Sequence, residues 1–479
     1  MSRPSIRFGT DGWRALVAEE FTFPNVRWVT QAVSGYLKSH PASGRGRKVI
    51  VGYDTRPLGD RFAEAVAEVF AGNGFQVLLT NGPMPTPAIS FAIRELGLQG
   101  GIGVTASDNP FTYNGLKFKP SYAGPAQPQM THWIERRLFK GKLRRIPLQE
   151  GIAQGKIRLI DLAPLYLGFL KRYVRWNAIR KADFRIAYDS MQGAGQDFLE
   201  RLTAGSRLRV ISVDAGDSRG RSSHRPEPVG EHLGRLKAVV RKQRCDLGLA
   251  TDGDADRAGI VAPGGDFISS QETMSLLLWH LLEDRRWRGM VVTTVAGTNL
   301  MEAIARCYQV PFKRTPVGFK HIARLMRTTD VLFGGEESGG FGFRGCVPER
   351  DGLLAGLLIL EMMAMRKKSL GTILHQMKTR FGQWVYARTD LTLTKPIKKV
   401  PGTKAAQLYK SFARMVPGTI QKIQTTDGLK VIFADKNWLL LRPSGTEPLL
   451  RIYAEGRTSK QVKNLLKAGQ QMGRQIAAQ

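Results

Sequence analysis

The chain has 479 residues, which is too long for one hydrophobic core, so we expect three or four domains. Apolar residues make up 42% of the chain, enough to fill several cores. The net charge of +32 could indicate a nucleic-acid-binding protein, but Lys and Arg are spread along the chain, and the denser basic stretches lack a binding motif or a regular aromatic pattern. We therefore expect solvated surface charge, with a positive field that attracts anionic ligands as the functional alternative.

The cysteines and the apolar segments exclude two other classes of protein. Cys245, Cys307 and Cys346 are odd in number and far apart, which argues against a disulfide framework and against a zinc site. The N-terminus has no apolar signal core, and the most apolar run, residues 353–365, is short and interrupted by Glu361. We expect a buried helix there, no membrane span and a reducing, cytoplasmic location.

A unit of strand, loop and helix recurs three times along the chain. The expected elements are a strand at residues 48–53, a helix at 61–71 and a strand from 76; a strand at 184–188, a helix near 196–202 and a strand at 209–213; and a strand at 290–294 with a helix at 300–307. Such alternation predicts α/β layers with largely parallel pairing, in three related domains. Short strands at 391–393, 431–433 and 438–441, with an amphipathic helix from about Ser459, predict a smaller α+β module at the end.

Three aspartates follow a predicted strand at residues 247–250. Asp252, Asp254 and Asp256 alternate in the sequence DGDADR, and carboxylates at this spacing can converge on one hard cation such as Mg²⁺. A calcium-binding EF-hand would need Gly in place of Arg257, which excludes that alternative. Three aspartates after a buried strand are costly unless they are neutralised, so a metal site is favoured over a solvated acidic turn.

Ser107 stands at a similar place, after a predicted strand at residues 101–104. A serine hydroxyl is a weak nucleophile until a cation or a base activates it, and no Ser-His-Asp arrangement can be assigned. Assistance from a metal on the aspartate loop is therefore the simpler hypothesis. Without that loop, a hydroxyl that supports a turn or a helix cap would be the better interpretation.

Two further loops carry groups that bind anions and hydroxyls. Residues 442–446, RPSGT, offer a guanidinium, two hydroxyls and backbone amides, which suits a dianionic phosphate, with a tight turn between strands as the alternative. Residues 334–340, GGEESGG, hold two carboxylates and a hydroxyl on backbone that can bend, which suits sugar hydroxyls or an ordinary acidic loop.

Two matches to common motifs are discarded. Residues 340–345 fit GxGxxG, but Pro348 follows and no helix is expected there, which argues against a dinucleotide site. Residues 216–220 fit the hydrolase elbow GxSxG, yet they lack its strand-to-helix context.

Six motifs, in one order, resemble the α-D-phosphohexomutase superfamily over nearly the whole chain. They are FGTDGWR at residues 8–14, TASDNP at 105–110 with YNGLK at 113–117, DGDADR at 252–257, TPVGFK at 315–320, GGEESGG at 334–340 and RPSGTEP at 442–448. The GGEESGG motif together with PERDG at 348–352 is similar to the phosphoglucomutase branch.

The resemblance implies four domains around one central cleft, with three related α/β domains that have mixed sheets and a C-terminal α+β domain. Each domain would supply one loop to the cleft. We place the domains at residues 1–150 with the phosphoserine loop, 151–263 with the metal loop, 264–380 with the sugar-binding loop and 381–479 with the phosphate-binding loop. The last domain is expected to close over the cleft, because water would hydrolyse the phosphoserine.

The resemblance also implies the reaction. Ser107, as a phosphoserine, and the three aspartates would hold Mg²⁺, and Ser107 would give its phosphoryl group to glucose 1-phosphate. The resulting glucose 1,6-bisphosphate, which would also be the activator, would turn over and return its other phosphoryl group, leaving glucose 6-phosphate. Lys117 and Arg14 would stabilise charge or move protons. The substrate-binding residues would be Arg257, Gly318, Lys320, Glu336, Ser338, Arg442, Ser444, Gly445 and Thr446.

Two positions depart from the family pattern. Asp108 follows the serine where the family usually has His, and a carboxylate about 5 Å from the phosphoserine would cost roughly 3 kcal/mol per phosphate charge at an effective dielectric near 20. Mg²⁺ and nearby Arg residues could offset much of that cost. Gly340 stands where mannose-active and glucosamine-active relatives often have His, which favours glucose.

The preferred hypothesis is therefore a Mg²⁺-dependent phosphoglucomutase, an isomerase that acts on hexose phosphates as a monomer or homodimer, without a nucleic-acid or membrane partner. Three alternatives stay open: a phosphomannomutase or dual-specificity mutase, a non-catalytic sugar-phosphate-binding protein, and a nucleic-acid-binding protein driven by charge.

Overall fold

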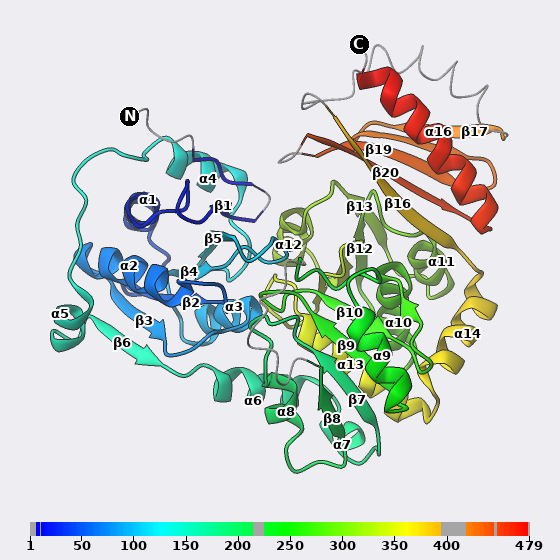
Figure 1. Ribbon diagram of the computed structural model, residues 1–479, viewed down its shortest axis with the longest axis horizontal. Helices are drawn as coiled ribbons and strands as arrows, with labels where there is room; N and C mark the ends of the chain where they lie inside the picture. The colour runs from blue at the N-terminus through cyan, green and yellow to red at the C-terminus, as the bar shows by residue number, and fades with distance from the viewer. Residues whose placement is uncertain (1–5, 10, 214–224, 394–417, 445–447, 478–479) are drawn as a thin grey trace.

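Four β-sheets follow one another along the chain in the computed structural model, which describes residues 6–9, 11–213, 225–393, 418–444 and 448–477. In Figure 1 the first sheet and its helices lie at the left in blue and cyan, the second and third lie together in green and yellow, and the last lies at the upper right in orange and red. Three sheets combine parallel and antiparallel pairs and the fourth is antiparallel, which confirms the predicted fold class.

The first sheet has the strand order β1-β5-β4-β2-β3-β6. Strand β2 pairs in parallel with β3 and β4, whereas β5 runs antiparallel to β4 and β1. The elements are β1 (Trp13–Leu16), α1 (Phe23–Ser39), β2 (Lys48–Tyr53), α2 (Gly59–Gly72), β3 (Gln76–Thr80), α3 (Thr86–Glu95), β4 (Gly100–Val104), β5 (Tyr113–Pro120), α4 (Pro128–Glu135), α5 (Leu148–Ala153) and β6 (Ile157–Ile160).

The second sheet has the order β11-β10-β9-β7-β8 and the third has the order β13-β12-β14-β15. The elements of the second domain are α6 (Ala163–Tyr173), α7 (Trp176–Ile179), β7 (Arg185–Asp189), α8 (Phe198–Thr203), β8 (Arg209–Ser212), α9 (Gly234–Lys242), β9 (Leu247–Thr251), β10 (Ala258–Val261) and β11 (Phe267–Ile268). The elements of the third domain are α10 (Ser270–Glu283), β12 (Met290–Thr294), α11 (Asn299–Cys307), β13 (Phe312–Thr315), α12 (Phe319–Thr328), β14 (Val331–Gly335), β15 (Phe341–Phe343), α13 (Gly352–Arg366) and α14 (Leu370–Phe381).

The fourth sheet has the order β16-β20-β19-β18-β17 and packs against one long helix, α16. Its elements are β16 (Val385–Thr392), β17 (Ile420–Gln424), β18 (Leu429–Phe433), β19 (Trp438–Pro443), β20 (Leu449–Gly456) and α16 (Ser459–Ala477). A small cluster joins this sheet to the third domain, because Val295 and Ala296 pack with Trp438, Leu440 and Tyr453.

The strands β4, β9 and β14 hold equivalent places in the first three sheets. Each pairs in parallel with a central strand, β2, β7 or β12, and in antiparallel with the strand that follows it, β5, β10 or β15. All three are buried along their whole length, which explains why their sequences are apolar or rich in glycine. Because chain order and pairing are the same, the loops that leave their carboxyl ends are positioned alike, and these loops carry Ser107, Asp252 and Glu336.

Most predicted elements lie where the sequence placed them. The apolar run at residues 353–365 forms α13, whose residues 352–363 are all buried in the core that joins the domains. Among the described residues, no helix has both the length and the apolar character needed to span a membrane. Two sheets extend past the predicted domain ends, because β6 pairs with β3 and β11 pairs with β10. The first sheet therefore continues beyond residue 150 and the second beyond residue 263.

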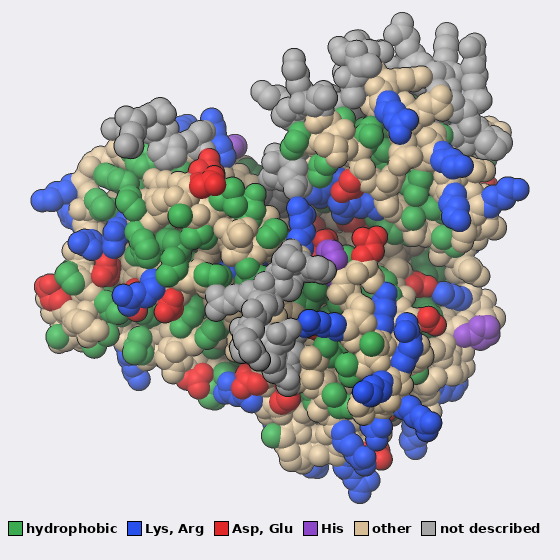
Figure 2. All heavy atoms as spheres, in the orientation of Figure 1, with side chains coloured by type: hydrophobic (Ala, Val, Ile, Leu, Met, Phe, Trp, Pro, Cys, Tyr) green, Lys and Arg blue, Asp and Glu red, His purple; other side chains and the backbone are tan. Residues whose placement is uncertain are grey.

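Basic side chains do not form one patch on the face drawn in Figure 2. Lys and Arg are scattered over all parts of that face, and the outline is indented between the first domain and the C-terminal domain. This distribution agrees with solvated surface charge.

Candidate active site

Ser107 is buried at the end of β4, and its hydroxyl meets the aspartate loop of the second domain. Its Oγ donates a hydrogen bond of 2.8 Å to Oδ2 of Asp252, and its carbonyl accepts one of 2.5 Å from Nη2 of Arg56. The two loops approach closely because Gly253 has no side chain: a carbon added there would lie 2.3 Å from the carbonyl oxygen of Ser107. Ser107 itself adopts a φ of 52°, an uncommon conformation for a residue with a side chain.

The three aspartates of the loop converge. Asp252, Asp254 and Asp256 are fully buried, and one carboxylate oxygen of each lies within 4.8 Å of the others. Burial and the two neighbouring carboxylates raise the pKa of Asp252 well above its usual range. Among the described residues, Oδ1 of Asp254 and Oδ1 of Asp256 are buried and have no hydrogen-bond partner. Buried carboxylate oxygens with this spacing and without hydrogen-bond donors fit a hard divalent cation.

Lys117 on β5 supplies positive charge next to the aspartates. Its Nζ lies 2.7 Å from Asp254, 2.9 Å from Asp256 and 3.1 Å from Asp11. Burial alone would lower the pKa of Lys117, but the three carboxylates outweigh it and raise that pKa above the usual range. The ammonium group therefore stays protonated, which suits charge stabilisation rather than proton transfer.

Asp108, the residue that departs from the family pattern, is held between two arginines. Nη1 of Arg14 lies 3.1 Å from its Oδ1, and Nη1 of Arg257 lies 3.1 Å from its Oδ2. Burial would raise the pKa of Asp108, but Arg257 and Arg14 hold it well below its usual range. The carboxylate is charged, and two guanidinium groups neutralise that charge next to Ser107.

The sugar loop, so named because residues 334–340 are predicted to bind sugar hydroxyls, begins where β14 ends, and its first carboxylate is anchored from two sides. Glu336 accepts a hydrogen bond of 3.1 Å from the backbone N–H of Gly318 and lies 3.6 Å from Nη1 of Arg350. Burial raises the pKa of Glu336 to about 7, while Arg350 opposes that rise. Ser338 follows two residues later and is half-buried. The loop thus carries a titratable carboxylate and a partly accessible hydroxyl.

The phosphate-binding loop predicted in the C-terminal domain is tied to the third domain. Nε of Arg442 and the backbone N–H of Val317 both donate 2.8 Å hydrogen bonds to Oδ2 of Asp427. The backbone N–H of Ser444 donates to the carbonyl of Leu449. Gly445 and Thr446 lie outside the described residues.

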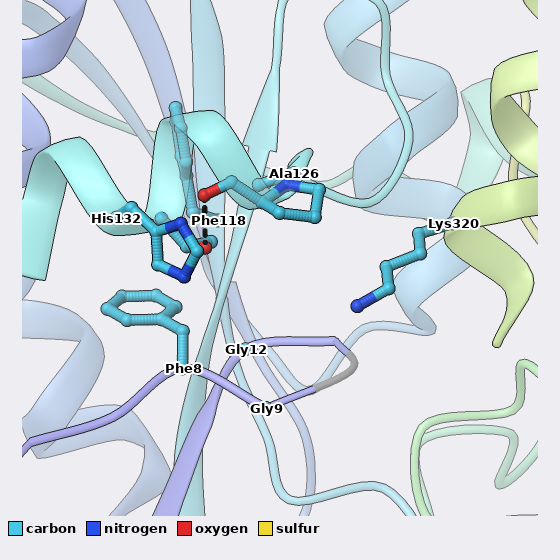
Figure 3. Close-up of a pocket in the computed structure, with 9 residues that line it drawn as sticks. Phe8, Gly9, Gly12, Phe118, Ala126, His132 and Lys320 are labelled. Atoms are coloured by element: carbon cyan, nitrogen blue, oxygen red, sulfur yellow. Dashed lines mark hydrogen bonds between the residues drawn. The ribbon is translucent and has the colours of Figure 1, made fainter. Parts of the chain in front are cut away.

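Lys320 reaches from α12 toward the first domain. It lines a cavity of about 80 Å³ with Gly9 and Gly12, opposite His132 and Phe118 (Figure 3). Burial lowers the pKa of Lys320, and Arg442 adds to this, while Asp11 and Asp427 oppose it. Lys320 is therefore within electrostatic range of both the first and the last domain.

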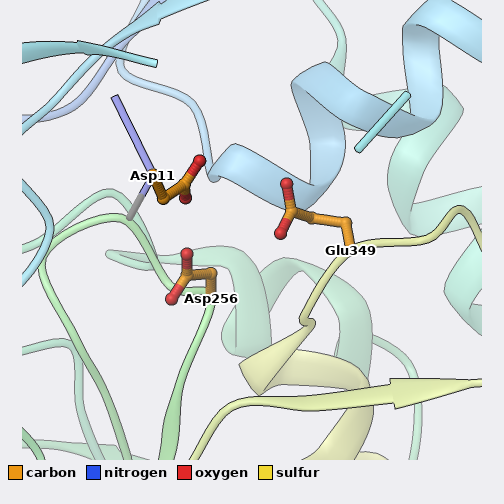
Figure 4. A group of neighbouring side chains, drawn as sticks. All are labelled: Asp11, Asp256 and Glu349. Atoms are coloured by element: carbon orange, nitrogen blue, oxygen red, sulfur yellow. The ribbon is translucent and has the colours of Figure 1, made fainter. Parts of the chain in front are cut away.

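A second group of carboxylates lies beside the first and was missed by the sequence reasoning. Asp11, Asp256 and Glu349 point toward one another from three segments of the chain, with ligand atoms within 4.8 Å (Figure 4). Lys119 and Arg350 occupy this group: Lys119 forms ion pairs with Asp11 and Glu349, and Arg350 with Asp11 and Asp256. It is an ion-pair network. The available signal was sequence context, since Asp11 lies in FGTDGWR and Arg350 in PERDG.

Comparison with known proteins gives matches along the whole chain. Models of four successive domains of phosphoglucomutase/phosphomannomutase match it: alpha/beta/alpha domain I at residues 5–145, domain II at 164–265, domain III at 269–381 and the C-terminal domain at 391–468.

Individual relatives carry several substrate names. A phosphoglucomutase/phosphomannomutase of Thermococcus kodakarensis is 32% identical over 463 residues, 96% of this chain and 97% of the relative. A phosphoglucosamine/phosphogalactosamine mutase of Sulfurisphaera tokodaii is 28% identical over 460 residues, with the same coverage of 96% and 97%. A crystal structure from Thermus thermophilus, named "putative phosphomannomutase", has a TM-score of 0.83 at 33% identity and covers 98% of this chain and 99% of its own.

Proposed function

The chain belongs to the phosphoglucomutase/phosphomannomutase family of the α-D-phosphohexomutase superfamily, whose members are isomerases, and we propose that it interconverts glucose 1-phosphate and glucose 6-phosphate. The observation that carries the proposal is the hydrogen bond of 2.8 Å between the Ser107 hydroxyl and Asp252, within a buried group of three aspartates. This geometry supports Ser107 as the group that accepts and donates the phosphoryl group.

Asp252, Asp254 and Asp256 would hold Mg²⁺, and the buried Oδ1 atoms of Asp254 and Asp256, which accept no hydrogen bond from a described residue, support this assignment. When bound, the ion would neutralise charge on the phosphoryl oxygens. Lys117 would add a protonated ammonium group next to Asp254 and Asp256. Little covalent help is needed for transfer between oxygens, so alignment and charge neutralisation would provide most of the rate increase.

The reaction balances as two transfers through one serine. In the first transfer the free hydroxyl of glucose 1-phosphate forms a new P–O bond as the P–Oγ bond of the phosphoserine breaks, and the proton of that hydroxyl ends on Oγ of Ser107. The bisphosphate then turns over. In the second transfer Oγ of Ser107 takes the other phosphoryl group as the P–O bond at the sugar breaks, and the serine proton ends on the sugar oxygen that is released. As the resemblance implies, the phosphate at the far end would be held in both orientations by Arg442, Ser444, Gly445 and Thr446. Glu336 and Ser338 would hold sugar hydroxyls, and Lys320 would bind the substrate.

The choice of sugar is the finer part of the proposal. Glucose is favoured by Gly340, which replaces the histidine expected in mannose-active and glucosamine-active relatives. The names of the relatives include phosphomannomutase and phosphoglucosamine mutase, so those sugars are the second candidates. The cytoplasmic location, the monomeric or dimeric state and glucose 1,6-bisphosphate as activator stay predictions.

Asp108 does not exclude catalysis on electrostatic grounds. An isolated carboxylate next to the phosphoserine would repel it, but Arg14 and Arg257 both lie 3.1 Å from this carboxylate. A non-catalytic sugar-phosphate-binding protein is therefore the weaker candidate.

The test is a turnover assay with purified protein, Mg²⁺ and a trace of glucose 1,6-bisphosphate. We expect interconversion of glucose 1-phosphate and glucose 6-phosphate, with lower kcat/KM for mannose and glucosamine phosphates measured in competition. Calorimetric binding of the sugar phosphates without turnover of any of them would support the non-catalytic alternative. Tight, salt-sensitive binding of DNA or RNA that the bisphosphate displaces would support the nucleic-acid alternative.

A further inference from the structure

Arg350 connects the active-site loops of three domains. Its Nη2 lies 2.9 Å from Oδ2 of Asp11 in the first domain and 2.6 Å from Oδ2 of Asp256 in the aspartate loop. Its Nη1 lies 3.6 Å from Oε2 of Glu336 in the sugar loop. The side chain is 6% exposed, so the guanidinium is buried among these loops rather than facing solvent.

Gly340 is the position that makes room for this arginine. A carbon added at Gly340 would lie 2.3 Å from Cδ and 3.0 Å from Cγ of Arg350, but 3.6 Å from its Cβ. Real contacts of this kind essentially never fall below 3.0 Å, so any side chain at position 340 would push the stem of Arg350 away. The stem cannot move without cost, because its guanidinium is fixed by the ion pairs with Asp11 and Asp256.

We propose that Arg350 is a positioning residue for substrate binding, which holds the sugar-loop carboxylate Glu336 in register with the aspartate loop, and that Gly340 is the position that admits it. This inference rests on the proposed function for its effect on the substrate, whereas the packing of the pair is independent of any reaction. A larger residue at position 340, such as His, is incompatible with Arg350 in this place.

The packing is tested by a double-variant cycle read by thermal unfolding of the full chain. Gly340→Ala should lower Tm measurably, by roughly 1 °C for each kcal/mol lost, because the entropy of unfolding grows with chain length. In the Arg350→Ala background the same change should have almost no effect, because only the Cβ at 3.6 Å remains. In the Arg350→Lys background the effect should persist, because the lysine stem keeps its Cδ.

A matched control is Gly151→Ala in the first domain, where the added carbon would lie 2.6 Å from Cδ1 of Ile157. Its effect on Tm should add to that of Arg350→Ala, as for distant sites. If Gly340→Ala lowers Tm as much in the Arg350→Ala background as in the unmodified protein, the proposed contact between positions 340 and 350 is wrong. If Arg350→Ala does not fold, the single variant Gly340→Ala tests the inference, and unchanged Tm and KM in that variant would overturn it.

The positioning role is tested by kinetics of Gly340→Ala, which keeps every charged group. We expect KM for glucose 1-phosphate to rise about tenfold, within the range of coupled neighbours, with a smaller change in kcat. A loss confined to kcat, with KM unchanged, would contradict a role in the sugar loop. Absence of turnover in the unmodified protein would refute the proposed function and leave the Tm cycle valid.

Discussion

The hydroxyl of Ser107 and the carboxylate of Asp252 are 145 positions apart in the chain and 2.8 Å apart in the structure. Each residue follows a fully buried strand, β4 or β9, and these two strands occupy equivalent positions in their sheets. The two loops touch because Gly253 allows the backbone of Ser107 to approach. The site therefore forms because the first two domains share one strand topology and because their two loops meet at Gly253.

Loss of one aspartate should weaken metal binding. For Asp252→Asn we expect Mg²⁺ affinity, measured by calorimetry, to fall at least about tenfold, because changes outside the ligand shell alone typically cost about 10- to 100-fold. Chelation of the metal should abolish turnover of the unmodified protein. The exposed Asp266→Asn is the matched control and should bind Mg²⁺ normally. Equal affinity of the two variants would argue against the metal site.

Substrate binding should depend on the ionisation of Glu336. Burial raises the pKa of this carboxyl from 4.5 to about 7, so the anion that accepts sugar hydroxyls becomes the major form only above that pH. We expect 1/KM to rise about tenfold between about pH 6 and about pH 8. The raised pKa in the folded state also affects stability. The contribution of Glu336 to the free energy of unfolding is fully present below pH 4.5 and is lost as pH rises through about 7.

The matched variant for that pH profile is Glu336→Gln. The phosphate of the substrate also titrates near this range, and only the part of the profile that disappears in Glu336→Gln belongs to the carboxyl group. An unchanged profile in this variant would assign the dependence to the substrate.

The two arginines beside Asp108 should act as a unit with it. Arg257→Met removes one of the two guanidinium partners, so the carboxylate repels the phosphoserine, and we expect kcat to fall at least about tenfold. The double variant Asp108→Asn with Arg257→Met should recover part of this loss, because the repelling charge is gone. Additive losses in the double variant would show that Asp108 and Arg257 are not coupled.

Stability should depend on a buried charge network outside the cleft. Glu361 on α13 accepts hydrogen bonds from His280 at 3.0 Å, from the backbone N–H of Arg175 at 2.7 Å and from two nitrogens of Arg285. Burial would raise the pKa of Glu361, but these donors lower it to about 2. Since the folded pKa is depressed, the stability from this group is present above pH 4.5 and is lost as pH falls toward about 2.

Glu361→Gln removes the carboxylate that pairs with the buried Arg285 and should destabilise the protein by about 3–5 kcal/mol, measured as a lower Tm by scanning calorimetry. Glu283→Gln is the control, because its ion pair with Arg380 is exposed, and such pairs contribute about 0–1 kcal/mol. Similar Tm values for the two variants would show that the network contributes little.

The strands and loops of the site were predictable because their signals are local. Residues 101–104 and 247–250 are apolar or small, lie in buried strands and are followed at once by polar groups. The role of Arg350 was not predictable, because its partner Asp11 is 339 positions away, and its place depends on the missing side chain of Gly340. The same holds for Asp108, since the sequence shows its charge but not the arginines that enclose it.

The most direct measurement is phosphate incorporation at Ser107. Protein incubated with Mg²⁺ and glucose 1,6-bisphosphate, labelled in both phosphates, should gain one phosphoryl group by intact mass, located on the peptide that contains Ser107, and should pass the label to glucose 1-phosphate. Ser107→Ala should remain unlabelled and inactive while Tm stays close to that of the unmodified protein. Labelling of Ser107→Ala at another residue, or turnover without any labelled protein, would contradict the account.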